Sequence, residues 1–191
     1  VMKKYELTSE FVTNDFGKKL FRIKALVSFG NVKEGQLGGF IENEGNLSHD
    51  GDAWVSGDAW VSGNARVFGD AWVSGAAWVS GNARVFGDAW VSGDAWVSGN
   101  ARVFGNARVF GDADYAVVKG FGRYFRATTF FRCKDKILRV QCGCFYGDLT
   151  QFREIVKKTH GDSKHAKEYL AIADLMELHF SDAEAKQEAS E

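Results

Sequence analysis

The chain contains little proline, cysteine or histidine, and its charges nearly cancel. Among its 191 residues there is no proline, and there are three cysteines and four histidines. No apolar run of about 18 residues occurs, so the sequence predicts no membrane-spanning helix. The net charge is −1, which argues against a general affinity for nucleic acid or membrane surfaces. Three cysteines in a chain of this size favour a reducing cytoplasm, and Met2, Lys3 and Lys4 lead into a strand-like segment and not into a signal peptide.

The most abundant feature of the chain is an 18-residue repeat. Residues 52–69 read DAWVSGDAWVSGNARVFG, residues 88–105 are identical to them, and residues 70–87 differ only by Ala76 in place of Asp. Each unit consists of three hexads, two of type DAWVSG and one of type NARVFG. A fixed short period of this kind is typical of a solenoid, in which each repeat stacks on the next.

Each hexad predicts one short strand and one corner. In the first clean hexad Val55 points inward, and Trp54 and Ser56 point outward, because side chains alternate along a strand. Ala53 points inward again near a corner, where Gly57 tolerates the positive φ of a turn. Three such sides close a triangular prism. This pattern of aliphatic, small and turn residues resembles the hexapeptide repeat of left-handed parallel β-helices.

We therefore predict a mainly β protein built on a left-handed parallel β-helix of about four coils. The predicted segments are an N-terminal β cap over 1–44, the hexapeptide-repeat β-helix over 45–117, a cap over 118–181, and an acidic tail over 182–191. Residues 112–117 are interpreted as the last, degenerate hexad. Caps are expected because the end coils of a β-helix present unpaired backbone groups.

The segment after the repeats predicts a β-hairpin followed by two helices. Strand-like patterns cover 124–133 and 136–144, and one face of this hairpin gathers Phe125 and other apolar residues. Asp148 begins the first helix, with Gln151 three residues on as in a capping box. The buried side of the second helix is expected to carry Tyr169, Ala173, Met176 and Phe180.

The outward positions of the repeats form columns, because like residues recur at every coil. One face carries Trp54, Trp72 and Trp90, a second carries Trp60, Trp78 and Trp96, and the third carries Arg66, Arg84 and Arg102 beside Phe68, Phe86 and Phe104. Six exposed tryptophans would form a larger apolar patch than monomeric soluble proteins usually tolerate. Tryptophan and arginine are also frequent binding hot spots. We predict an interface at these residues; the alternative is that stacked tryptophans only stabilise neighbouring coils.

No catalytic, cofactor-binding or metal-binding residues are predicted. Acyltransferases with hexapeptide repeats need a general base, and only His49 lies near the coils. A metal site could be drawn from four residues, which are Cys142, Cys144, His160 and His165. Cysteines two residues apart on an apolar strand face are, however, usually inert core residues. Tryptophan columns could stack on sugar rings, but no polar cluster would orient the sugar.

Charge is distributed unevenly along the chain. Residues 50–117 carry eight Asp against four Arg, whereas residues 118–141 carry seven Lys or Arg against one Asp. These seven basic residues could contact phosphates: Lys119, Arg123, Arg126, Arg132, Lys134, Lys136 and Arg139. We favour a solvated polar face there, so nucleic acid is not the favoured partner of the basic hairpin over 119–139, and no membrane partner is predicted.

Several stretches outside the repeats resemble a group of small proteins encoded by phages, prophages and bacterial genomes. They are residues 5–8 (YELT), 37–48 (LGGFIENEGNLS), 141–152 (QCGCFYGDLTQF) and 157–162 (KKTHGD). The resemblance covers nearly the whole chain, and the group carries no catalytic residues to transfer. It implies a viral origin and the cytoplasm of a bacterial host. Small accessory phage proteins often bind and disable a host defence complex such as a CRISPR nuclease.

These observations together predict a non-enzymatic phage or prophage protein-interaction module. Its partner is expected to be a host protein or a second copy of the chain, with inhibition of a host defence complex as the sharpest version. The alternatives are a trimeric acyltransferase-like enzyme with hexapeptide repeats and a structural virion or scaffold protein. The sequence leaves open the identity of the partner, the oligomeric state and the outer face that is used.

Overall fold

The computed structural model describes residues 2–188, and for residues 182–188 it describes the backbone alone. The chain divides into two compact units, Val1–Asp112 and Ala113–Glu191. Within the described residues, no helix combines the length and the apolarity needed to cross a bilayer.

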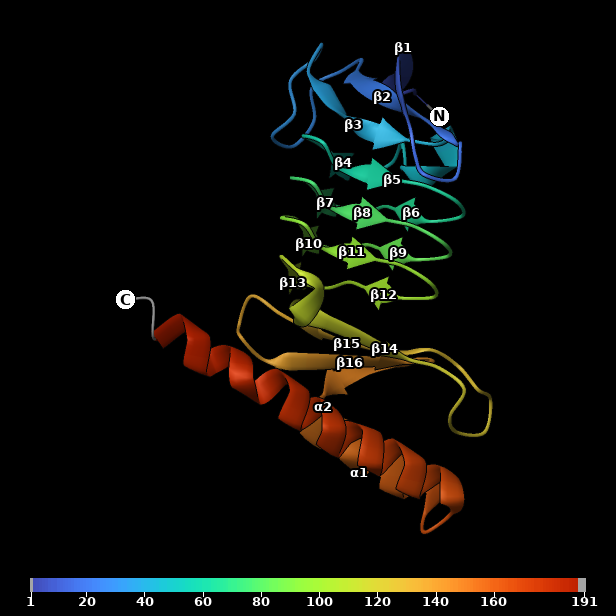
Figure 1. Cartoon of the computed structure of the whole chain (residues 1–191), viewed down its shortest axis with the longest axis vertical. Helices are drawn as coiled ribbons and strands as arrows, with labels where there is room; N and C mark the ends of the chain where they lie inside the picture. The colour runs from blue at the N-terminus through green and yellow to red at the C-terminus, as the bar shows by residue number, and fades with distance from the viewer. Residues whose placement is uncertain (1, 189–191) are drawn as a thin grey trace. The chain divides into compact units, whose positions relative to one another are not determined.

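The first unit is a parallel β-solenoid in which two-residue strands stack in columns (Figure 1). The strands are β4 (Trp54–Val55), β5 (Trp60–Val61), β6 (Arg66–Val67), β7 (Trp72–Val73), β8 (Trp78–Val79), β9 (Arg84–Val85), β10 (Trp90–Val91), β11 (Trp96–Val97), β12 (Arg102–Val103) and β13 (Arg108–Val109). Each strand from β4 to β10 pairs in parallel with the strand one coil further on, as Trp54 does with Trp72 and Arg66 does with Arg84. The mainly β fold and the solenoid are thereby confirmed, and the sheet β4-β7-β10-β13 contains one strand from each of four coils.

The interior of the solenoid is filled by valine and alanine. Val61, Val79 and Val97 form one fully buried column, and the alanine two residues before each valine is also buried. Burial of one such valine contributes roughly 1.5–3 kcal/mol. At the corners the glycines have positive φ, as Gly57 does at 64°, a conformation that a side chain would strain. The predicted inward and corner positions are therefore confirmed.

The first coil has a longer corner than the others. Leu47 forms its bridge to Val67, twenty residues further on. Val55, in contrast, pairs with Val73, eighteen residues further on. The two additional residues consequently lie in the corner between Leu47 and Val55, which makes this corner different from the uniform corners above it.

The N-terminal strands extend one face of the solenoid. They are β1 (Tyr5–Thr13), β2 (Lys19–Ala25) and β3 (Leu37–Ile41), and the short 3-10 turn η1 (Glu44–Asn46) follows. β1, β2 and β3 pair antiparallel in sequence order, and β3 then pairs in parallel with β5. The Lys4 ammonium donates to the carbonyls of Gly51 at 3.0 Å and Ala53 at 2.9 Å, and the Tyr5 hydroxyl donates to the Leu47 carbonyl at 2.7 Å. These bonds satisfy carbonyl groups of the first coil, which would otherwise present an open edge.

The buried ammonium of Lys4 predicts a rise in stability under alkaline conditions. Burial lowers the pKa of Lys4 from 10.5 to about 8, although Asp52 and Asp50 partly oppose this. The unfolded chain therefore binds more protons than the folded chain from about pH 8 upward, and stability rises with pH. Burial also raises the pKa of Tyr5, which opposes the rise above about pH 10, where unfolded tyrosine ionises. We expect the free energy of unfolding in urea to increase from about pH 8 to about pH 10, and Lys4→Met to remove the increase. A flat profile in the unaltered chain would contradict this assignment.

The second unit consists of an antiparallel sheet and two helices. The sheet has the order β14 (Tyr115–Val118), β15 (Thr128–Arg132), β16 (Leu138–Cys142) and β17 (Phe145–Asp148), and α1 (Leu149–His160) and α2 (Lys164–Glu188) follow it. Asp148 and Gln151 form the predicted capping box, and Gly161 ends α1. The second helix buries Tyr169, Ala173, Met176 and Phe180 as predicted.

Two placements in the C-terminal prediction were wrong. Residues 112–117 form no last hexad, because a 3-10 turn, η2 (Asp112–Asp114), is followed by β14, which pairs antiparallel with β15. The next corner glycine would fall at position 117, where the chain has valine, so the corner cannot form. Phe125 lies in the loop before β15 and is 65% exposed. In the predicted acidic tail, the backbone of residues 182–188 is helical, and residues 189–191 lie outside the described residues.

Candidate interaction surfaces

The first tryptophan column is only partly available for binding. Trp54 was predicted to be exposed, but it is buried, with its ring 5.5 Å from that of Phe29 and 6.4 Å from that of Tyr5. The N-terminal segment covers this end of the column, which alternation along a strand does not reveal. Two coils further on, Trp90 is 48% exposed, and the Arg108 guanidinium lies 5.0 Å from its ring.

The second tryptophan column joins neighbouring coils. The rings of Trp78 and Trp96 stack at 5.0 Å, and the ring of Trp60 meets that of Trp78 edge-on at 5.5 Å. The indole nitrogens of Trp78 and Trp96 donate to Ser62 at 3.4 Å and Ser80 at 3.2 Å. These contacts stabilise the stack, as cross-strand aromatic pairs do. Trp96 is nevertheless 47% exposed, and a binding role for this column stays a prediction.

The third face combines a phenylalanine column with an arginine column. The ring of Phe86 lies parallel to those of Phe68 and Phe104, at 4.8 and 4.7 Å. Arg66 and Arg84 face each other across paired strands and are exposed, at a strand spacing of about 4.8 Å. Neither arginine forms an ion pair with any residue that the structure describes. The two arginines therefore add positive charge to this face that no described acidic side chain pairs with.

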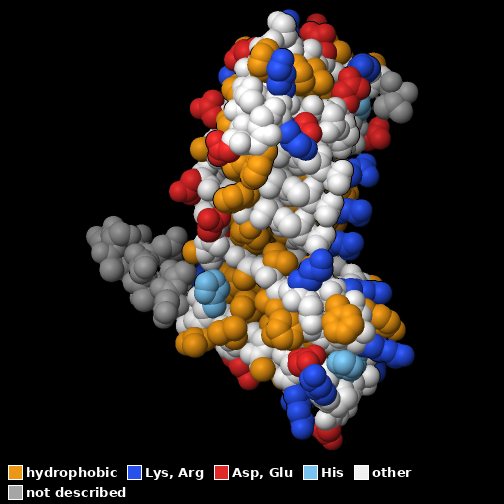
Figure 2. All heavy atoms as spheres, turned by 45° about the vertical axis from the view of Figure 1, so that its right-hand side comes forward, with side chains coloured by type: hydrophobic (Ala, Val, Ile, Leu, Met, Phe, Trp, Pro, Cys, Tyr) orange, Lys and Arg blue, Asp and Glu red, His pale blue; other side chains and the backbone are white. Residues whose placement is uncertain are grey.

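The corner beside the arginines carries amides in place of carboxylates. The hexads with arginine begin with asparagine, and the side-chain amides of Asn64 and Asn82 donate to Asn82 and Asn100 at 3.2 and 3.3 Å. Stacked asparagines satisfy one another's hydrogen bonds without adding charge to this corner. Figure 2 shows basic side chains aligned along one edge of the solenoid, next to a face where hydrophobic side chains gather.

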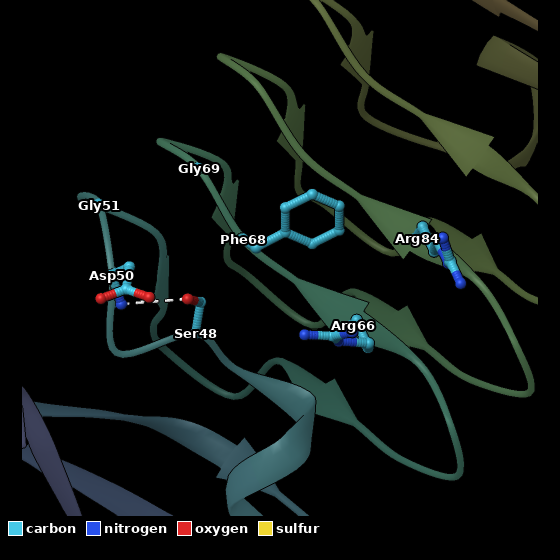
Figure 3. Close-up of a pocket in the computed structure, with 7 residues that line it drawn as sticks. All are labelled: Ser48, Asp50, Gly51, Arg66, Phe68, Gly69 and Arg84. Atoms are coloured by element: carbon cyan, nitrogen blue, oxygen red, sulfur yellow. Dashed lines mark hydrogen bonds between the residues drawn. The ribbon is translucent and has the colours of Figure 1, made fainter. Parts of the chain in front are cut away.

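The long first corner forms a groove against the arginine face. This open groove has a volume of about 320 Å³, and its lining residues are Ser48, Asp50, Gly51, Arg66, Phe68, Gly69 and Arg84. Figure 3 shows Ser48, Asp50 and Gly51 on the corner loop, with Phe68 beside them and the two arginines on neighbouring coils beyond it. The Asp50 backbone N–H donates to the Ser48 hydroxyl at 3.0 Å. This groove was not predicted from the sequence, although the extra spacing between Leu47 and Val55 is a visible signal for it.

His49 belongs to the same corner loop but does not line the groove. Its ring stacks on that of Tyr5 at 4.3 Å, and its Nδ1 accepts the backbone N–H of Lys4 at 3.2 Å. Burial lowers the pKa of His49. The observed contacts therefore place this imidazole in the packing between the N-terminal segment and the first coil.

Two of the seven basic residues predicted on the hairpin pair with acidic residues of the second unit. Arg132 pairs with Asp114 at 3.6 Å, and Arg139 pairs with Asp135 at 2.7 Å. In the hairpin register Cys142 lies opposite Thr128, which places Cys133 five residues away along the strand. Among the described residues, no three His, Cys, Asp or Glu side chains come together in a group that could hold a metal ion.

A known family of β-solenoid repeats matches part of the chain with the same 18-residue spacing as the coils. The family model described as YdcK Beta solenoid repeat matches residues 59–75, 77–93 and 95–111. The chain carries β-solenoid repeats. The three matched segments of β-solenoid repeat follow one another at the same 18-residue period as the paired strands, and they leave both flanking segments unmatched. No curated protein matches the chain.

Proposed function

We propose that the chain is a non-enzymatic protein-interaction module of a phage or prophage, and that its third face binds an acidic protein surface. The observation that carries the proposal is the pair Arg66 and Arg84, which are exposed, adjacent and without an acidic partner among the described residues. The stacked phenylalanines beside them provide apolar contact area. Arginine and aromatic residues of this kind are frequent binding hot spots.

The geometry of the third face suits carboxylates on a protein surface. A guanidinium group binds a carboxylate through two parallel hydrogen bonds, and its planar shape makes that pairing specific. An acidic partner would also neutralise the positive charge of the two arginines. The groove at the first corner, lined by Phe68, would receive a side chain of the partner. The repeated backbone bonds between coils hold these groups in place before binding, which reduces the entropy cost of association.

The sequence motifs outside the repeats indicate where the partner is found. Their resemblance to small phage and prophage proteins supports a partner in the bacterial host. The most specific form of the proposal is that this partner is a host defence complex such as a CRISPR nuclease. The hexad pattern supports a left-handed coil. A second copy of the chain is the other candidate partner, which the exposure of Trp90 and Trp96 favours. The absolute mass in solution, measured by light scattering, distinguishes self-association from binding to a host protein.

The double variant Arg66→Glu/Arg84→Glu tests the third face. The partner is first identified from host lysate by cross-linking to the unaltered protein and is then purified for titration. Reversing two central charges should weaken binding at least about 30-fold, which corresponds to about 2 kcal/mol. The matched control is Lys24→Glu/Lys33→Glu, which makes the same charge change at exposed positions of the same unit. Equal affinity of the two double variants, with both folded, would contradict the assignment of this face.

A further inference from the structure

The second unit contains a cavity of its own. Its volume is about 220 Å³, and it lies among the loop before β15, the end of β16, the start of β17 and the two helices. A cavity of about 150 Å³ lined by apolar residues is known to hold benzene, so this cavity has room for one small ring with a substituent. None of its lining residues belongs to the solenoid.

The floor of the cavity is apolar and aromatic. Phe152, Val156 and Tyr169 are buried there, and the ring of Phe152 lies 5.5 Å from that of Phe145 and 5.8 Å from that of Tyr169. Aromatic walls favour a flat ring, which packs against their edges and faces. A flexible chain of the same volume would lose more conformational freedom on binding.

Two arginines line the cavity from the loop before β15. The guanidinium groups of Arg123 and Arg126 lie 5.5 and 4.8 Å from the ring of Tyr124, which lines the cavity with them. Both arginines are exposed, and neither pairs with an acid among the residues that the structure describes. No described acidic side chain lines the cavity. Glu168 of α2 is occupied elsewhere, since it accepts the Gly122 N–H at 3.0 Å and lies 3.6 Å from both Lys164 and His165.

Close packing holds this loop against α2. Gly122 has a φ of 69°, and a Cβ atom there would collide with the Tyr169 hydroxyl, so only glycine permits the approach. Its N–H bond to Glu168 fixes the same point. The arginines one and four residues later are therefore attached to a loop with a defined position.

We propose that this cavity binds a small aromatic carboxylate. The ring occupies the slot formed by Phe145, Phe152 and Tyr169, and the carboxylate accepts hydrogen bonds from Arg123 and Arg126. The apolar floor selects the ring, and the two unpaired guanidinium groups select the negative charge. This site is independent of the third face of the solenoid, so one can fail without the other.

Thiol labelling of the full-length protein measures occupancy directly. Cys144 is exposed and Cys142 is partly exposed, and both line the cavity, whereas Cys133 is buried. Phenylacetate should slow the reaction of Cys144 with a chromogenic disulfide in a saturable manner, by roughly tenfold at ten times its dissociation constant. Its neutral analogue, phenylacetamide, should not protect the thiol at the same concentration. Absence of protection at roughly 10 mM phenylacetate, or equal protection by the amide, would overturn the proposal.

Substitution of an arginine that lines the cavity distinguishes a loss of carboxylate binding from a loss of folding. Arg126→Ala should weaken protection by phenylacetate at least about tenfold, the loss of one charge-assisted contact, and should leave the melting temperature unchanged. Lys134→Ala removes an exposed cation of the same unit that does not line the cavity, and should have no effect. Unaltered protection in Arg126→Ala would show that the arginine does not bind the ligand, and the proposal would then be wrong.

Discussion

Val79→Asp should abolish cooperative folding of the solenoid. Val79 is fully buried and pairs with Val61 in the coil before it and with Val97 in the coil after it. The interior around this column consists of valine and alanine, so a carboxylate there would have no hydrogen-bond donor from a side chain. Burying an unpaired charge costs several kcal/mol. The expected loss of about 4–5 kcal/mol or more is comparable to the whole stability of a small domain.

Urea unfolding followed by tryptophan fluorescence measures this loss, because all six tryptophans lie in the first unit. The matched control is Ser80→Asp, which places the same side chain at the next residue. The Ser80 hydroxyl points outward and accepts the indole N–H of Trp96, and a carboxylate can accept the same bond. We expect this control to change stability by no more than about 0.5 kcal/mol. Similar unfolding midpoints for the two variants would contradict the inward assignment of Val79.

Deleting residues 70–87, one complete repeat unit, should leave a folded solenoid. The deletion joins Gly69 to Asp88 and recreates the same Gly-Asp junction that Gly69 and Asp70 form in the intact chain. Every valine stays on an inner column, and every glycine stays at a corner. Because each coil contacts only its neighbours, the loss is limited to one coil and one interface between coils.

Deleting residues 70–78, half of that unit, should be far more damaging although it removes fewer residues. Gly69 would then join Val79, which advances the following chain by nine positions and moves the valines off the inner faces. Since side chains alternate with a period of two, an odd shift turns the buried set outward. Thermal unfolding monitored by circular dichroism should show a cooperative transition for the 18-residue deletion and none for the nine-residue deletion. A cooperative transition in the nine-residue deletion variant would show that the valines need not keep their inward positions, and the prediction would be wrong.

Most of the buried positions of the solenoid could be predicted from residues that are close together in the sequence. The alternation around Val55 and the glycine corners such as Gly57 depend on neighbouring residues alone, and both are confirmed. The capping box of Asp148 and Gln151 is equally local. The error at residues 112–117 was avoidable, because valine at position 117 already rules out a corner with positive φ. The strand β17 was missed because it has only four residues and follows a tight turn at Gly143.

The candidate sites were predicted less well than the fold. The outward direction of the tryptophan and arginine columns was foreseeable, and Arg66 and Arg84 are indeed exposed. That neither pairs with an acid among the described residues became clear only in three dimensions, because ion pairs form between residues far apart in the chain. The cavity of the second unit was not predicted, since its lining comes from a loop, two strands and both helices, which are far apart in the sequence.

By itself, the sequence determined the period of the solenoid, the identity of its inner and outer columns and the start of the first helix. These features depend on φ, on side-chain alternation and on caps, which act over a few residues. Only the tertiary structure decided which outward side chains remain available. Trp54 is covered by Tyr5 and Phe29, and Gly122 is held against Tyr169 by close packing. Coverage of this kind depends on contacts between distant segments, and no local pattern encodes it.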